Sequence, residues 1–267
     1  DTINAELVPD ESTDERKVVM HPQLGRLEVS RDAIRPEPTP PAWKSSISAG
    51  VIGNNKDGND DVTATFAATS TYKKDGDKLS LKGGYNYNTT RDGNEPFKVQ
   101  TDKGSATVRY DRRLSRGISL VTFADYYYNA TNEASVNTVK GAVGLGVPLI
   151  NTPSTQLTLS LGPSFQWGNG GSDCDTDSAC GRTYPGASFT TELDWTPNPS
   201  FRISLDNNFS ALAASELKPT NSFGASIKYF PSITSGMFTS LQFLSTYNSI
   251  AKPEIDNTVN GQVGIEF

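Results

Sequence analysis

The last ten residues, "TVNGQVGIEF" (258–267), alternate between two kinds of side chain. One face carries apolar residues or glycine, and these are Val259, Gly261, Val263, Ile265 and Phe267. The other face carries polar or very small residues, and these are Asn260, Gln262, Gly264 and Glu266. Successive side chains of a β-strand point to opposite faces of its sheet. The stretch therefore predicts a strand that separates two different media.

The same two-residue period repeats along most of the chain, with almost no helical pattern. No apolar run approaches the roughly 18 residues that a transmembrane helix needs. We count twelve strands, which lie within residues 43–51, 62–72, 79–88, 106–111, 117–129, 136–149, 156–167, 186–195, 200–211, 222–231, 236–247 and 258–267.

The predicted connections alternate in length. The short ones are residues 73–77, 114–117, 150–155, 196–200 and 232–235. Between them fall longer ones at 54–60, 90–103, 168–185, 212–221 and 248–257, with a brief one at 130–135. Short periplasmic turns and long extracellular loops are typical of outer-membrane barrels, as is an even number of strands.

The aromatic residues indicate which face meets which medium. Trp and Tyr gather near the strand ends of the apolar face, as interfacial girdles do, and we assign a girdle of Trp43, Tyr85, Tyr126, Trp167, Trp195 and Tyr229. The polar face is rich in Gly, Ser and Thr, which suits an enclosed interior. The sequence thus predicts an all-β fold, a twelve-stranded antiparallel transmembrane β-barrel over residues 43–267. A secreted β-sandwich adhesin is the alternative.

In a barrel the charged side chains of the polar face point into the lumen. They are Lys44, Lys82, Arg109, Asp111, Asp125, Lys140, Glu192, Asp194, Arg202, Asp206, Lys228 and Glu266. Burying such a cation costs several kcal/mol unless it is paired, and the carboxylates make pairing feasible. The network could close and brace the barrel, or line a wet pore. Twelve strands lie between filled and open barrels, so both alternatives stay open.

The first residues differ from the rest. Short candidate strands at 3–8, 17–21 and 25–30 predict a small periplasmic β-module over residues 1–34, and the start at Asp1 indicates a processed or truncated chain. A Pro-rich linker, "RPEPTPPA" (35–42), follows. A disordered arm is the alternative for this segment.

Two cysteines, Cys174 and Cys180, stand in the loop stretch "CDTDSAC" and predict a disulfide formed in an oxidising compartment. Asp173, Asp175 and Asp177 alternate in the same loop and could gather oxygen ligands around Ca²⁺. The stretch lacks the spacing and the distal Glu of an EF-hand loop, so a solvated acidic loop is the favoured interpretation. We predict no cofactor.

Charge and histidine content exclude two classes of function. The net charge is −6 and there is no basic cluster with interleaved aromatic residues, which argues against nucleic acid as a partner. The single histidine, His21, lies in the N-terminal module, so no base is present to activate the barrel serines. We therefore expect no enzyme and no catalytic residues.

Several segments resemble a known family. They are "WKSSISAGVIGN" (43–54), "VRYDRRLSRGISL" (108–120), "GAVGLGVPL" (141–149) and "VVMHPQLGRLEVSRDAI" (18–34). They are similar to the salt-induced outer-membrane proteins, an uncharacterised bacterial barrel family for which no catalytic residues are established. The resemblance covers most of the chain and implies a location in the bacterial outer membrane.

These observations predict a non-enzymatic, porin-like barrel with an envelope-integrity role and a narrow pore for small polar solutes or ions. Its partners would be outer-membrane lipid and the barrel-assembly machinery, which would read the C-terminal strand ending in Phe267. The alternative function is anchoring, in which residues 1–42 dock a periplasmic or cell-wall partner.

Overall fold

The computed structural model describes residues 5–8, 12, 16–30, 42–56, 59–114, 117–177, 179–214, 217–232, 235–249, 251 and 254–267. The chain forms two compact units, Asp1–Pro41 and Ala42–Phe267. No helix in the described part of the chain is long and apolar enough to cross a membrane.

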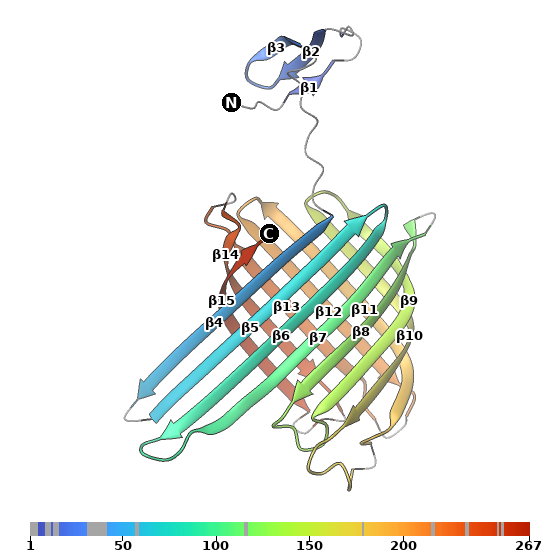
Figure 1. Cartoon of the computed structure of the whole chain (residues 1–267). Helices are drawn as coiled ribbons and strands as arrows, with labels where there is room; N and C mark the ends of the chain where they lie inside the picture. The colour runs from blue at the N-terminus through green and yellow to red at the C-terminus, as the bar shows by residue number, and fades with distance from the viewer. Residues whose placement is uncertain are drawn as a thin grey trace. The chain divides into compact units, whose positions relative to one another are not determined.

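The second unit is a closed barrel of antiparallel strands (Figure 1). Its twelve strands are β4 (Trp43–Lys56), β5 (Asn59–Lys74), β6 (Asp77–Asp92), β7 (Lys98–Arg113), β8 (Ser119–Asn129), β9 (Asn137–Asn151), β10 (Thr155–Asn169), β11 (Thr183–Asn198), β12 (Phe201–Leu212), β13 (Thr220–Tyr229), β14 (Met237–Tyr247) and β15 (Ile255–Glu266). Each strand pairs with its neighbours in sequence, and β15 pairs with β4. The backbone of Phe267 completes this closure with two hydrogen bonds to Ser45, both 2.8 Å. The predicted fold class is confirmed.

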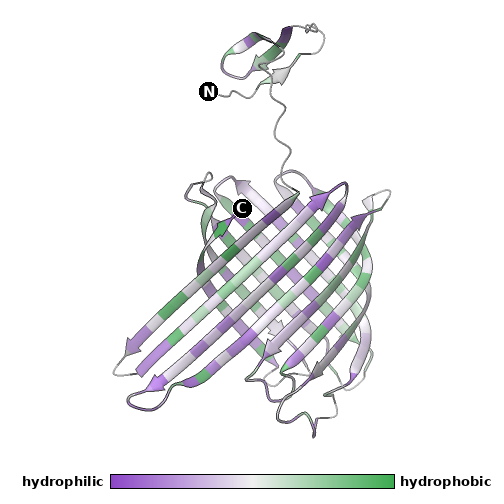
Figure 2. Ribbon diagram, in the orientation of Figure 1, coloured by the Kyte–Doolittle hydropathy of each residue, from purple (hydrophilic) through white to green (hydrophobic). Residues whose placement is uncertain are grey.

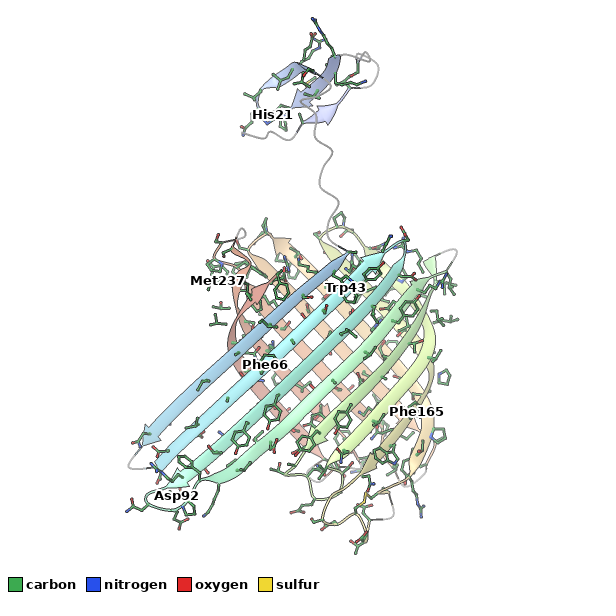
Figure 3. The ribbon with its side chains drawn as sticks, in the orientation of Figure 1. His21, Trp43, Phe66, Asp92, Phe165 and Met237 are labelled. Atoms are coloured by element: carbon green, nitrogen blue, oxygen red, sulfur yellow. A yellow bond between two sulfur atoms is a disulfide. The ribbon has the colours of Figure 1, made fainter. Side chains whose placement is uncertain are left out.

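We call the end of the barrel that holds Trp43 and the β5–β6 connection the turn end, and the opposite end the loop end. Figure 3 shows Trp43 and Met237 at the turn end and Asp92 at the loop end. Most of the longer connections lie at the loop end, and the β10–β11 connection between Asn169 and Thr183 is the longest. The exceptions are the short β4–β5 connection at the loop end and the β13–β14 connection between Tyr229 and Met237, which is long for the turn end.

Two predicted loops are wrong. Of residues 54–60, the described ones, 54–56 and 59–60, are strand, and within 90–103 only residues 93–97 separate β6 from β7. The strands β5, β6 and β7 each have 16 residues, whereas about 9–11 are enough to cross a bilayer. Their loop ends extend past the membrane, where both faces meet water and apolar alternation is not needed. This is why the pattern missed them.

Most apolar side chains of the barrel point outward. Figure 2 shows hydrophobic and hydrophilic residues interspersed along the strands. Exposed apolar residues recur at alternate positions, as at Val143, Leu145, Val147 and Leu149 of β9.

Aromatic rings flank the apolar surface. At the turn end the rings of Trp43 and Tyr72 lie 5.2 Å apart, and those of Phe201 and Tyr229 lie 5.0 Å apart. The six girdle residues of the sequence analysis are exposed, except Trp167, which is partly buried.

The first unit holds a three-stranded sheet of β1 (Glu6–Leu7), β2 (Arg16–His21) and β3 (Gly25–Ser30). Val18 and Val19 of β2 are buried. The backbone N–H groups of Gln23 and Leu24 donate to His21 Nδ1 in the β2–β3 turn. The predicted linker 35–42 lies outside the described residues apart from Ala42.

Candidate functional site: the charged lumen

The interior face is identified by contacts between strands that are not neighbours, because such contacts must cross the lumen. Lys78 of β6 lies 2.9 Å from Glu192 of β11, and Arg109 of β7 lies 3.2 Å from the same carboxylate. Arg109 also pairs with Asp111 at 3.0 Å, and Lys78 lies 3.7 Å from Asp194. The contacts of Lys78 and Arg109 with Glu192 and Asp194 bridge one wall of the barrel to the other, whereas Arg109 and Asp111 lie on the same strand.

The two walls carry opposite charge. Lys78, Lys82 and Arg109 project from β6 and β7. Facing them from β11 and β12 are Glu192, Asp194 and Asp206, where Glu192 and Asp206 are direct partners in the strand register. At mid-barrel a mainly cationic wall therefore opposes an anionic wall, with Asp111 beside Arg109 as the exception on the cationic side.

Lys82 and Asp206 show how wide the lumen is. Their strands β6 and β12 are on opposite sides of the ring, yet the Nζ–Oδ1 distance is 3.6 Å. Twelve strands about 4.8 Å apart and tilted by about 40° would enclose a circle about 24 Å across between backbones. A lysine and an aspartate that meet as Lys82 and Asp206 do span at most about 14 Å between their Cα atoms. The cross-section is therefore flattened into a slot.

Glycines lie at the two narrow edges of this slot. Between β9 and β10, a Cβ on Gly144 would lie 2.4 Å from the carbonyl oxygen of Leu161, and one on Gly162 would lie 2.1 Å from that of Val143. Between β15 and β4, a Cβ on Gly264 would lie 2.4 Å from the carbonyl oxygen of Ile47. Only glycine permits such close approach, so these positions let the wall bend sharply.

Open space lies beside the side chains at the middle of the slot. The side chains of Lys82 and Asp206 are 47% and 51% exposed although both point inward. Ser105, on the lumen-facing side of β7, is also exposed. By contrast, Arg109 and Glu192 are 13% and 14% exposed. The lumen thus leaves open space around one crossing ion pair and little around the other.

The turn end of the lumen holds a second charged cluster. Glu266 pairs with Lys44 at 2.8 Å and with Arg202 at 2.5 Å. Lys228 donates to the hydroxyl of Ser46 at 3.0 Å and lies 4.3 Å from the ring centroid of Phe238. Phe238 is almost fully buried, and its ring packs against that of Phe230. This apolar pair narrows the turn end.

The loop end holds a third crossing. Lys103 of β7 lies 2.5 Å from Asp256 of β15, and the hydroxyl of Tyr127 donates to the same carboxylate at 2.9 Å. Asn86 of β6 donates to Asn260 of β15 at 3.2 Å. The sequence analysis missed Lys78, Lys103 and Asp256, because they lie where it ended strands or placed loops.

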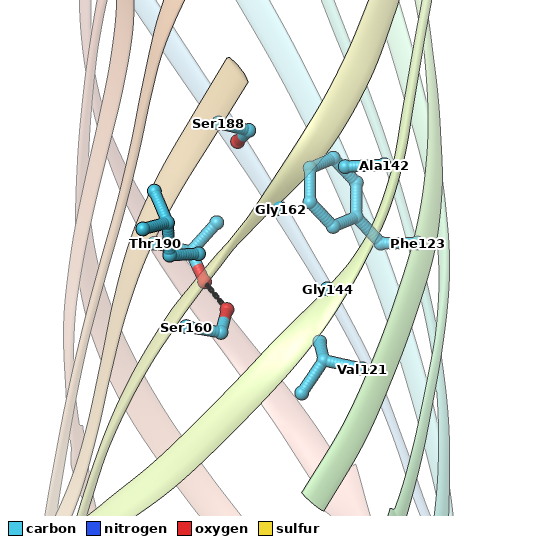
Figure 4. A pocket seen from close by; sticks show the side chains of 9 residues that line it. Val121, Phe123, Ala142, Gly144, Ser160, Gly162, Ser188 and Thr190 are labelled. Atoms are coloured by element: carbon cyan, nitrogen blue, oxygen red, sulfur yellow. Dashed lines mark hydrogen bonds between the residues drawn. The ribbon is translucent and has the colours of Figure 1, made fainter.

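The wall formed by β8 to β11 is less charged. Asp125 and Lys140 are direct partners in the register of β8 and β9. Beside them lies a small pocket bordered by Val121, Phe123 and Ala142 on one side and by Ser160 and Thr190, which share a hydrogen bond, on the other (Figure 4). Val121 and Phe123 are buried in the lumen. The sequence analysis did not identify these apolar inward residues.

Loops contact one another at the loop end, where Ala179 and Tyr184 pack against Leu212, Ala214 and Leu217. The predicted disulfide joins Cys174 to Cys180. In the β12–β13 and β14–β15 loops, Lys218 lies 3.4 Å from Glu254, whose carboxylate raises the pKa of the lysine.

The three aspartates of the disulfide loop form turns. The backbone N–H groups of Thr176 and Asp177 donate to the carbonyl of Asp173, and the Asp177 carboxylate accepts from the N–H of Ala179. No group of three His, Cys, Asp or Glu residues in the described ranges is arranged to hold a metal ion. The structure therefore gives no support to a calcium site at Asp173, Asp175 and Asp177.

A closed antiparallel barrel with an apolar exterior, aromatic belts and a charged lumen defines a class, the transmembrane β-barrels of the outer-membrane type. Within this class the chain belongs to the DUF481 family, described as proteins of unknown function, whose family model matches residues 47–259. That description carries no function, so the resemblance to salt-induced outer-membrane proteins stays a prediction. No curated protein matches the chain.

Solved barrels resemble the chain distantly. The translocator domain of the autotransporter NalP from Neisseria meningitidis has 10% identity and a TM-score of 0.42, covering 86% of this chain and 90% of that one. The KdgM porin has 9% identity and a TM-score of 0.40, with 84% and 98% covered. An outer-membrane channel from Pseudomonas putida F1 has 10% identity and a TM-score of 0.42, with 87% and 98% covered. None of these likenesses transfers a function.

Proposed function

We propose that this protein is a non-enzymatic barrel of the bacterial outer membrane, with a narrow, water-filled slot that passes small polar solutes or ions. The turn end would face the periplasm and the loop end the outside, as in other barrels with short turns and longer loops. An envelope-integrity role fits the same architecture, because ion pairs brace the walls at three levels.

One observation carries the pore proposal. Lys82 and Asp206 meet across the slot, and yet each keeps about half of its side-chain surface accessible to water. A lumen that only braced the barrel would bury this pair, as it buries Arg109 and Glu192. The accessible surface at mid-barrel supports an aqueous path beside the crossing pair.

The interior carboxylates support a non-catalytic role. Glu192, Asp206, Asp256 and Glu266 are all bonded to cations rather than to serine or histidine. An ion-paired carboxylate is held in its charged form and makes a poor general acid. The lumen charges would therefore select and orient solutes rather than transform them.

Planar-bilayer recordings test the pore. Wild-type protein should conduct weakly, and Lys82→Ser should conduct more, because the shorter side chain removes the crossing at mid-slot. Lys98→Ser is the matched control: Lys98 pairs with Glu95 at 2.7 Å at the loop end, and its side chain is 61% exposed. Silence of the folded wild-type protein, or equal conductance of Lys82→Ser and wild type, would overturn the proposal.

A second candidate function is anchoring by the first unit. It is favoured by the separate sheet of β1 to β3, which forms a compact unit of its own. The full chain and a variant that lacks residues 1–41 would be compared for retention of envelope components from detergent extracts. Equal retention by both would exclude the anchoring function.

A further inference from the structure

The barrel is only half closed at its seam, the junction between the last strand, β15, and the first barrel strand, β4. Within the described residues, the register between β15 and β4 runs from Glu266↔Ser46 to Val263↔Ala49 and stops there. The two flanking ladders continue to the loop end, reaching Lys56↔Asn59 on one side and Tyr247↔Ile255 on the other. The loop-end halves of β4 and β15 therefore each lack a partner on the side that faces the seam.

Exposure on the lumen side of β4 agrees with the missing pairing. Ile52 points toward the lumen and yet is 62% exposed, and its outward neighbour Val51 is 75% exposed. Across the seam, Val259 is 65% exposed. A Cβ added to Gly50 would lie 2.2 Å from the carbonyl oxygen of Gly261, so the two strands still touch at this level and part beyond it.

The open stretch lies within the membrane. A strand crosses a bilayer in about 9–11 residues, so β4 remains in the hydrocarbon from Trp43 at the turn-end girdle to about Gly53. Free backbone N–H and C=O groups exposed to lipid are strongly unfavourable, and open sheet edges in hydrocarbon are tolerated only beside a polar or water-filled space. The gap must therefore be filled by water or by a polar group.

The polar groups behind the gap are mostly amides. Gln262 accepts hydrogen bonds from Ser48 at 2.7 Å and from Gln242 at 3.1 Å. Asn86 donates to Asn260, but Asn86 Oδ1 is buried and has no hydrogen-bond partner in the described part of the chain. Asp256, the nearest carboxylate on β15, is already paired with Lys103. The space behind the seam thus offers uncharged donors and acceptors.

We propose that the loop-end half of the β4–β15 seam is a lateral opening that admits an amphiphile with an uncharged, hydrogen-bonding head group from the membrane. Its acyl chain lies between Val51 and Val259, and its head group reaches the amides of Asn86, Asn260 and Gln262. The opening lies in the wall and does not depend on conduction along the barrel axis.

Disulfide trapping tests whether the seam is open. Continuing the register would place Gly53 opposite Val259, a pair of the same hydrogen-bonding type as Ala49 and Val263. With Cys174 and Cys180 replaced by serine, Ala49→Cys/Val263→Cys should crosslink on oxidation in lipid vesicles, and Gly53→Cys/Val259→Cys should lose this crosslink. Heat-modifiable gel migration would verify folding. Equal crosslinking of the two pairs would overturn the proposal.

Quenching by brominated acyl chains tests entry of the amphiphile. A bimane label on Ile52→Cys should be quenched, approaching the level of the outward control Val51→Cys. The label on Ser105→Cys, which faces the lumen away from the seam, should not be quenched. If the label on Ile52→Cys is quenched as little as the label on Ser105→Cys, the lateral opening would be overturned.

The bimane label on Ile52→Cys also tests which class of head group the opening admits. Brominated amphiphiles of equal chain length, with a maltoside or a phosphoglycerol head, would be compared at position 52 after normalising to position 51. Stronger quenching by the maltoside supports the uncharged class. Equal or weaker quenching by it would overturn that assignment.

Discussion

Glu192→Gln measures how strongly the crossing ion pairs hold the two walls together. Glu192 is 14% exposed and lies 2.9 Å from Lys78 and 3.2 Å from Arg109. Removing one partner of a buried pair costs about 3–5 kcal/mol, mainly because a charge is left without compensation. Arg109 keeps Asp111 and Lys78 keeps Asp194, so we expect a loss of about 2–4 kcal/mol in the free energy of unfolding.

Equilibrium unfolding by urea in phospholipid vesicles measures this loss, with the fluorescence of Trp43, Trp167 and Trp195 as the signal. The matched control is Glu95→Gln, since Glu95 also pairs with a lysine, Lys98, but is 58% exposed. An exposed pair contributes little, so this control should stay close to wild type. Equal small losses in the two variants would refute the reasoning, because they would show that water screens the lumen pair as it does the surface pair.

Three further predictions concern the two ends of the barrel. Phe238→Ala should lower the free energy of unfolding by about 3 kcal/mol, because it opens a cavity beside Phe230, and the lipid-facing Phe243→Ala should cost less in the same urea titration. Replacing Cys174 and Cys180 by serine should speed proteolytic cleavage within residues 169–183 while leaving the barrel's heat-modifiable migration unchanged; loss of that migration would contradict the reasoning. The pKa of the Lys218 amine should lie above its ordinary value, so its ion pair with Glu254 should persist at neutral pH and be lost as the pH rises through the raised pKa. Glu254→Gln should lower the pKa of Lys218 in an NMR titration. An unchanged pKa in this variant would exclude the pairing.

The alternation of side chains was sufficient to predict the barrel, because a strand between lipid and lumen must repeat the same contrast at every second residue. It placed Arg109, Glu192 and Asp206 on the inward face, where the structure brings them together with partners across the lumen. It could not show which of them meet, since contacts between β6 or β7 and β11 or β12 depend on the curvature of the whole sheet.

The omissions also have physical causes. Lys103 and Asp256 lie in strand extensions whose outward neighbours, such as Asp102 and Asn257, are polar, so the local sequence is typical of a loop. Phe123 and Phe238 point inward although apolar residues were assigned to the lipid face. The missing pairing at the seam could not be predicted from the sequence of β4, because "WKSSISAGVIGN" (43–54) alternates like any paired strand. The segment of β15 that would pair with it is more than two hundred residues away in the chain.

The flattened lumen restricts passage in one direction more than in the other. Lys82 and Asp206 set the separation of the two broad walls, and the glycines at the edges let the ring remain wide at right angles to them. A round channel of equal area sorts molecules by diameter, whereas a slit sorts them by thickness. A planar solute can align its faces with the broad walls and pass edge-on, where a spherical solute of the same volume is held back.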